Sequence, residues 1–243
     1  MSRAAVVTTV ALAMLTTALA PSSAEAMDLE AGARLGGGWN SLVSPTDPAG
    51  TDTLLQGSSF GGMAFLIGPT ATMNLTEFEG AKLNLTADLL YGFHRASGWE
   101  RHMQGDTEVA RIDVYLSTHV LRLPLMVQVA SSDDTVSPTL GLGIEPIFGI
   151  MSGATVEQTG INQPVQALET TPTTSVAGLV AFGLDWNQGD FVVPVDLRLA
   201  WNPFVGTSTV DRFDGYEDRQ NPGAYRVAFN WQFMATAGIR WGL

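Results

Sequence analysis

Apolar and polar residues alternate along most of this chain, and the alternation is clearest in the last nineteen residues. From Tyr225 to Leu243 every odd position is apolar or aromatic, whereas most even positions are small, polar or charged. A period of two is the pattern of a β-strand, because successive side chains point to opposite faces. The segment therefore predicts one long, unbroken terminal strand with an apolar face.

Seven earlier segments alternate in the same way, which predicts an all-β protein of eight strands. The second segment is the least regular, because both of its faces are apolar or glycine. In the fourth, apolar residues move from even to odd positions, and we expect one extra residue, a β-bulge, near Thr118 to Leu121. The seven segments are Asp28–Trp39, Ser58–Ile67, Ala81–Phe93, Arg111–Val129, Thr139–Ile150, Ser175–Trp186 and Phe191–Trp201.

The connections between these segments differ in length in a regular way. Short connections follow the fourth and sixth segments, at Ala130–Ser137 and Asn187–Asp190, and a longer one, Gly68–Gly80, follows the second. Long loops at one end and short turns at the other are typical of outer-membrane barrels with an even number of strands. The predicted long loops are Asn40–Gly57, Arg95–Ala110, Gly153–Thr174 and Pro203–Ala224.

Two kinds of barrel fit a period of two. A soluble barrel would turn its apolar face inward around a ligand, and a transmembrane barrel would turn it toward lipid. The apolar faces of the clear segments carry no charge, and an Arg or Lys at the bilayer midplane costs ~2–4 kcal/mol. We therefore predict an antiparallel up-and-down transmembrane barrel.

Aromatic residues near the predicted strand ends support a membrane location, because they would form the two interfacial girdles of such a barrel. Trp39, Tyr91, Phe93, Trp201 and Tyr225 lie toward the long loops, and Trp186, Phe191 and Trp241 lie toward the short turns.

The N-terminal segment predicts export. Arg3 precedes an apolar stretch from Ala4 to Ala20, and Ala24-Glu25-Ala26 has the small-x-small pattern of a signal-peptidase site. The stretch is interrupted by threonines and is shorter than the ~20 apolar residues that span a bilayer. We expect a signal peptide over residues 1–26 and one barrel domain over residues 27–243.

Composition excludes several classes of function. The chain has no cysteine, so disulfides and thiol-bound metals are excluded, and its net charge of −12 argues against nucleic acid. We predict no cofactor and no metal site. Carboxylates between Asp211 and Asp218 could collect a divalent cation, but we favour a solvated surface loop, because Arg212 and Arg219 lie among them.

Charged residues on the opposite, polar faces are expected to point into the barrel. With eight strands the interior is just wide enough for side chains to fill it, and buried charges are tolerated only in pairs. Both a cross-linked polar plug and a narrow water-filled path are consistent with this set. Glu145 could pair with Arg122 or Arg198, and Asp196 with Arg226. The predicted interior charges are Glu30, Arg34, Lys82, Asp88, Arg111, Asp113, Glu145, Asp185, Asp196, Arg198, Arg226 and Arg240.

The last eight residues, Thr236 to Leu243, resemble the C-terminal signal read by the outer-membrane barrel-assembly machinery. Thr236, Gly238, Trp241 and Leu243 occupy its four positions, with Leu243 in place of the usual terminal aromatic. The apolar-Pro-apolar stretch Leu121–Leu125, within Tyr115 to Val129, is similar to a strand of the small outer-membrane β-barrel domains of bacteria. The resemblance implies an outer-membrane location with periplasmic termini and extracellular long loops.

Ser117 and His119 are the candidate pair for enzymatic activity. Ser117 and His119 share one face of the fourth segment, and Asp113 has the same parity. The lipid A deacylase barrels carry a His-x-Ser order, whereas this chain has Ser-x-His. We therefore predict a structural or surface-interaction protein rather than an enzyme, with a narrow pore as the alternative. The expected partners are outer-membrane lipid, the assembly machinery and an extracellular ligand bound by the long loops.

Overall fold

The computed structural model describes residues 28–42, 61–104, 107–132, 135–160, 170–203, 225–227 and 229–243. The expected signal peptide and the carboxylates Asp211 to Asp218 lie outside these ranges. In the described residues, no helix is long and apolar enough to cross a membrane.

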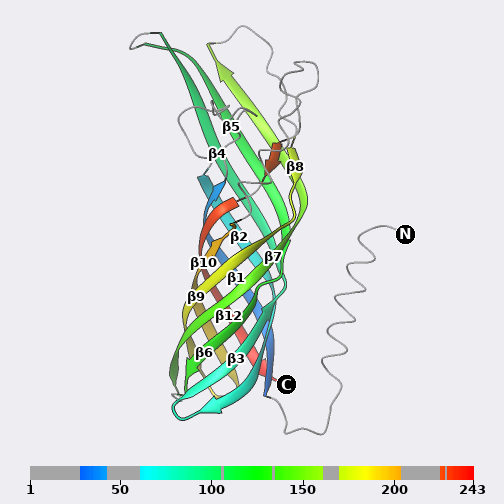
Figure 1. The fold of residues 1–243 in the computed structure, drawn as a ribbon, viewed down its shortest axis with the longest axis vertical. Coiled ribbons are helices and arrows are strands. Elements are labelled where there is room, and N and C mark those ends of the chain that lie inside the picture. Colours follow the sequence, from blue (N-terminus) through cyan, green and yellow to red (C-terminus); the bar gives the residue numbers. More distant parts are fainter. Residues whose placement is uncertain are drawn as a thin grey trace, which may run out of the picture.

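Antiparallel strands form one closed sheet, which Figure 1 shows as a tall barrel. Each strand pairs with its neighbours in the chain, and β1 pairs with both β2 and β12, so the sheet has no open edge around its circumference. β3 and β4 are two parts of one interrupted strand, as are β5 and β6, so the ten strand segments form an eight-stranded barrel. The barrel strands are β1 (Leu29–Leu42), β2 (Gly61–Phe78), β3 (Ala81–Asp88), β4 (Leu90–Gln104), β5 (Thr107–Arg122), β6 (Leu125–Ser131), β7 (Val136–Thr159), β9 (Ser175–Asn187), β10 (Phe191–Trp201) and β12 (Phe229–Gly242).

The all-β, eight-stranded antiparallel barrel is therefore confirmed. Two short strands, β8 (Thr170–Pro172) and β11 (Tyr225–Val227), pair with each other in parallel as a separate two-stranded sheet. The start of β1 pairs with the end of β12, Glu30 opposite Gly242. The hairpin turns at Gly80 and Gly189 have φ of 81° and 77°, a conformation that glycine adopts without steric cost. We call the end of the barrel with these turns the turn end and the opposite end the loop end.

The second strand is longer than expected. β2 continues to Phe78, so the predicted connection Gly68–Gly80 is wrong, and only Glu79 and Gly80 separate β2 from β3. Pro69 indicated a connection rather than a strand, because proline is rare inside sheets. It lies opposite Leu89, the residue between β3 and β4, where the regular pairing is interrupted.

The predicted loop Arg95–Ala110 is also wrong. β4 runs to Gln104 and β5 begins at Thr107, so the two strands form a hairpin that continues past the loop end of the barrel (Figure 1). The upper part of β7 pairs with β5 as far as Arg111 opposite Thr159. The outward face of this three-stranded extension carries charged residues such as Arg111, Asp113 and Glu157, because a sheet outside lipid has no apolar solvent to face.

The predicted bulge lies on a different strand. Residues of β5 and β6 keep one phase, with even positions buried, so Val114 and Leu116 point into the barrel. The pairing shifts between His119 and Val120, which lie opposite Met151 and Gly149, and the extra residue is Ile150 of β7. The predicted bulge near Thr118 to Leu121 is wrong because apolar side chains do not all face lipid: the interior near the loop end is itself apolar.

The terminal strand is interrupted where it begins. Ser41 lies opposite Trp231 and Leu42 lies opposite Phe229, so Asn230 is an extra residue in β12. Phe229 consequently points inward and is 4% exposed. From Trp231 onward the predicted alternation is confirmed.

The outer face of the barrel is apolar, and aromatic side chains lie near both ends of its strands. Trp39, Tyr91 and Trp201 are exposed toward the loop end, and Trp186 and Trp241 toward the turn end. Phe93 and Phe191 are half-buried on the same face, and Tyr225 has no described side chain. Trp231, which we did not predict for a girdle, stacks on Trp201 with ring centroids 5.6 Å apart. Trp241 is ten positions after Trp231 on β12. At ~3.3 Å per residue and a tilt of about 40°, they span ~25 Å, the height of a transmembrane apolar band.

Candidate functional site

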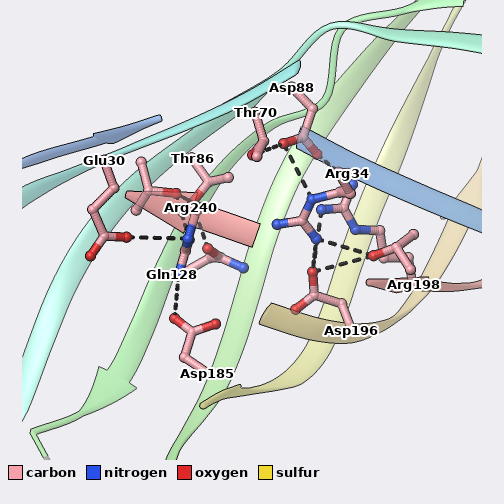
Figure 2. Close-up of polar contacts among 12 residues, drawn as sticks. Glu30, Arg34, Thr70, Thr86, Asp88, Gln128, Asp185, Asp196, Arg198 and Arg240 are labelled. Atoms are coloured by element: carbon pink, nitrogen blue, oxygen red, sulfur yellow. Dashed lines mark hydrogen bonds and ion pairs between the residues drawn. The ribbon is translucent and has the colours of Figure 1, made fainter. Parts of the chain in front are cut away.

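The middle of the barrel holds four interlocked charged side chains, Arg34, Asp88, Asp196 and Arg198, which we call the central network (Figure 2). Arg198 donates to Asp88 across 2.7 Å and lies 3.3 Å from Asp196. Arg34 lies 3.5 Å from Asp88 through its Nε and donates to Asp196 through its Nη1. All four residues are at most 2% exposed, and two cations balance two carboxylates.

Hydroxyl groups of neighbouring strands complete this network. Thr70 of β2 donates to Asp88 at 2.5 Å, and Arg34 donates to Thr236 of β12 at 3.1 Å. Thr236 can occupy the space between β1 and β10 because Gly36 faces it, and a Cβ at Gly36 would lie 2.7 Å from Cγ2 of Thr236. The network therefore joins β1, β2, β3, β10 and β12.

A second group lies toward the turn end, which we call the mouth cluster: Arg240, Glu30 and Asp185 (Figure 2). Arg240 contacts Glu30 at 3.2 Å and Asp185 at 2.7 Å, and it donates to Thr72 at 2.6 Å. These residues line a polar cavity of about 280 Å³. Arg240 is only 2% exposed, although it lines this cavity.

A third group lies nearer the loop end, and we call it the loop-side pair. Arg122 donates to Glu145 across 2.5 Å, and both side chains are at most 2% exposed. The guanidinium of Arg122 also contacts Sδ of Met234 at 3.7 Å and lies 5.5 Å from the centroid of the Phe229 ring. Of the two partners expected for Glu145, Arg122 is the one that the structure places there.

Some predicted interior charges lie elsewhere. Arg111 and Asp113 are on the outer face of the extension, where they pair with each other at 2.7 Å, so their placement in the barrel was wrong. The physical reason is the unbroken phase of β5, which turns odd positions outward. Lys82 is at the turn end, 43% exposed, and pairs with the exposed Glu77 at 3.3 Å. The side chain of Arg226 is outside the described part, so its pairing with Asp196 stays a prediction. The described partners of Asp196 are Arg34 and Arg198.

Several buried polar residues were absent from the predicted set, among them Arg122, His94, Asn40 and Gln232. Arg122 is expected only as a possible partner of Glu145, because the supposed phase change left its face undecided. His94, 4% exposed, gives no signal, because an isolated histidine in a strand has no pattern. Asn40 accepts a hydrogen bond from Gln232, and both are buried. In the sequence, only the position of each of these residues in the alternation of its strand could have indicated that it points into the barrel.

The pair considered for catalysis faces outward. Nδ1 of His119 is hydrogen-bonded to the hydroxyl of Tyr91, and its ring lies 5.0 Å from that of Phe93. Within the described ranges, no hydrogen bond joins Ser117 to His119, and Asp113 is bound to Arg111. In the same residues, no group of three or more His, Asp or Glu side chains could hold a metal ion.

The closed sheet, the apolar outer face and the two sets of exposed aromatic residues are the architecture of a small outer-membrane β-barrel. No family model and no curated protein matches this chain.

Several solved structures match most of this chain at low sequence identity. The attachment invasion locus protein Ail of Yersinia pestis is 8% identical, with a TM-score of 0.33, and the match covers 89% of this chain and 100% of Ail. Neisserial surface protein A is 11% identical at a TM-score of 0.36, covering 91% and 100%. The outer-membrane protease OmpT from Escherichia coli is 9% identical at 0.43, covering 91% and 99%. These values are too low to transfer a function, and the barrel is established by the strand pairing of this chain.

Proposed function

We propose that this protein is an integral outer-membrane barrel with a closed interior, and that it acts as a structural and surface-display element of the envelope. The central network carries the proposal. Four charges that are at most 2% exposed leave no room for a water column at their level. A conducting path requires charged side chains that are in contact with water. The charged side chains of the central network bind one another instead.

Two further layers support a closed interior. At the turn end Arg240 is held by two carboxylates, and toward the loop end the ion pair of Arg122 and Glu145 lies beside Phe229. An apolar cluster that includes Leu116, Val120 and Ile147 fills the space near the loop end. A solute would have to displace all three charged groups, so a narrow pore is the less favoured function.

The extension supports a role at the cell surface. β4, β5 and β7 continue past the barrel at the loop end, the end that outer-membrane barrels expose to the outside. The chain ends at the turn end, where Leu243 donates its backbone N–H to the carbonyl of Leu29 at 2.9 Å. We infer extracellular loops, periplasmic termini and an extracellular ligand for the loops or the extension. Recognition of Thr236, Gly238, Trp241 and Leu243 by the assembly machinery remains a prediction.

The test combines fractionation with electrical recording. Native protein should fractionate with the outer membrane and migrate faster on gels before heating than after it. In planar bilayers the wild type and Glu145→Ala should both lack stable conductance, whereas the variant should melt at a lower temperature because Arg122 loses its carboxylate. Steady channels in the wild type would show that the interior is a pore. Channels in Glu145→Ala alone would show that the loop-side pair is a gate.

A further inference from the structure

A polar patch interrupts the apolar outer face at the loop end of β4, β5 and β7. Arg95 lies directly opposite Ser117, and Ser117 lies opposite Gly153, so these three residues form one row across three strands. Arg95 is exposed and Ser117 is half-buried, both at outward-facing odd positions. A Cβ added at Gly153 would have only Ser117 Oγ nearby, at 3.5 Å, so the row ends in an open notch.

His119 adds a second polar group beside this row. It is two residues from Ser117 on the same face of β5 and lies opposite Phe93, so it is a diagonal neighbour of Arg95, within reach of a long side chain. The Tyr91 hydroxyl occupies Nδ1. When that hydroxyl donates, the imidazole proton is on Nε2, where it is a second hydrogen-bond donor.

The surroundings of the patch are those of a membrane interface. Met63 of β2 lies opposite Arg95 and is 71% exposed, and Met151 of β7 lies opposite His119 and is 56% exposed. Arg95 is two residues from Ser97, which forms the last described pair between β4 and β2, so it lies near the rim of the described barrel. In the described residues, no carboxylate contacts Arg95. A cation at the rim, with an apolar surface beside it, fits an anionic headgroup whose chains lie along the barrel.

We propose that Arg95, Ser117 and His119 bind the phosphate group of an outer-leaflet lipid. Arg95 supplies the charge, Ser117 and His119 donate hydrogen bonds, and the notch at Gly153 admits the phosphate oxygens. The acyl chains lie against Met63 and Met151. This site rests on the proposed outer-membrane location and identifies one lipid-contacting region of that surface.

Binding can be measured on the full barrel in a neutral detergent, after heat-modifiable migration has shown that it is folded. Dioctanoyl phosphatidic acid is titrated, with dioctanoylglycerol and inorganic phosphate as separate ligands, and native mass spectrometry counts the bound molecules. We expect one phosphatidic acid per barrel and weak binding of the other two. Arg95→Gln should weaken binding about tenfold, because one charge-assisted contact is lost.

Two further variants make the test specific. Arg111→Gln removes an equal charge from the outer face of the same hairpin but lies in the extension, so it should bind like the wild type. Gly153→Val fills the notch and should weaken binding while Arg95 is intact. Equal affinity in Arg95→Gln and Arg111→Gln would overturn the site, as would equal binding of inorganic phosphate or of dioctanoylglycerol. A folded barrel that binds no phosphatidic acid would refute this inference and leave the proposed function standing.

Discussion

Replacing Asp88 with asparagine tests the central network most directly. The side chain keeps its size but loses its charge, so the variant isolates electrostatics from packing. Asp88 accepts from Arg198 at 2.7 Å and Thr70 at 2.5 Å and lies 3.5 Å from Arg34, with its side chain fully buried. In Asp88→Asn, two buried guanidiniums share the single carboxylate of Asp196.

The expected loss is large, because removing one partner of a buried ion pair costs ~3–5 kcal/mol. The free energy of unfolding is measured by urea titration of the barrel in detergent or lipid, followed by tryptophan fluorescence and by gel migration. Asp113→Asn is the matched control. It breaks the ion pair between Arg111 and Asp113, whose side chains are 36% and 23% exposed, so it should cost much less than Asp88→Asn.

A double variant sharpens this prediction. Asp88→Asn combined with Arg198→Gln restores neutrality, with one arginine facing one carboxylate. It should be more stable than Asp88→Asn alone, with a coupling of about 1–3 kcal/mol between the two positions. A cost of Asp88→Asn no greater than that of Asp113→Asn would contradict a stabilising central network, as would a double variant as unstable as the sum of the two single variants.

Three other changes test the remaining features. Leu142 is 62% exposed on the outer face, so Leu142→Arg should lower the stability in lipid by ~2–4 kcal/mol. Val109 is 45% exposed in the extension, so Val109→Arg should be nearly neutral. Equal costs of the two variants in reversible unfolding would contradict a lipid-facing band. Gly80→Ala forces an L residue into a φ of 81° and should lower the free energy of unfolding by about 1 kcal/mol. Gly242→Ala is the neutral control in the same urea titrations, because φ at Gly242 is not positive. Phe229→Ala should cost ~3–5 kcal/mol because the ring is buried against Arg122; a loss below that of the exposed Trp231→Ala would place Phe229 outside the core.

The alternation of apolar and polar side chains predicted the barrel because the outer face of a transmembrane barrel contacts lipid and must be apolar. From Ala81 to Phe93 and from Phe191 to Trp201, one face is apolar and the other contains the residues that the structure buries, such as Asp88 and Asp196. Those strands span the apolar band, where a charge on the outside is expensive. The same rule failed for Val114 and Leu116, because the barrel interior has no equally strict requirement and accepts apolar side chains.

Loop boundaries were predicted less well, for a related reason. Pro69 suggested a connection, and the polar stretch from Arg95 to Ala110 suggested a loop, yet both are strands. Backbone hydrogen bonds to neighbouring strands stabilise these segments. Because such bonds depend little on the type of side chain, the sequence pattern did not predict them.

The sequence by itself determined the class of fold, the number of strands and the face that most of their residues occupy, because these depend on a local period of two and on the solvent that each face meets. Only the tertiary structure decided which charges meet. Arg34 and Asp196 are separated by 162 residues, and their contact depends on the register of β1, β12 and β10 around a closed sheet. Register is set by all the strands together, since the sheet must close on itself, and no single segment contains that information.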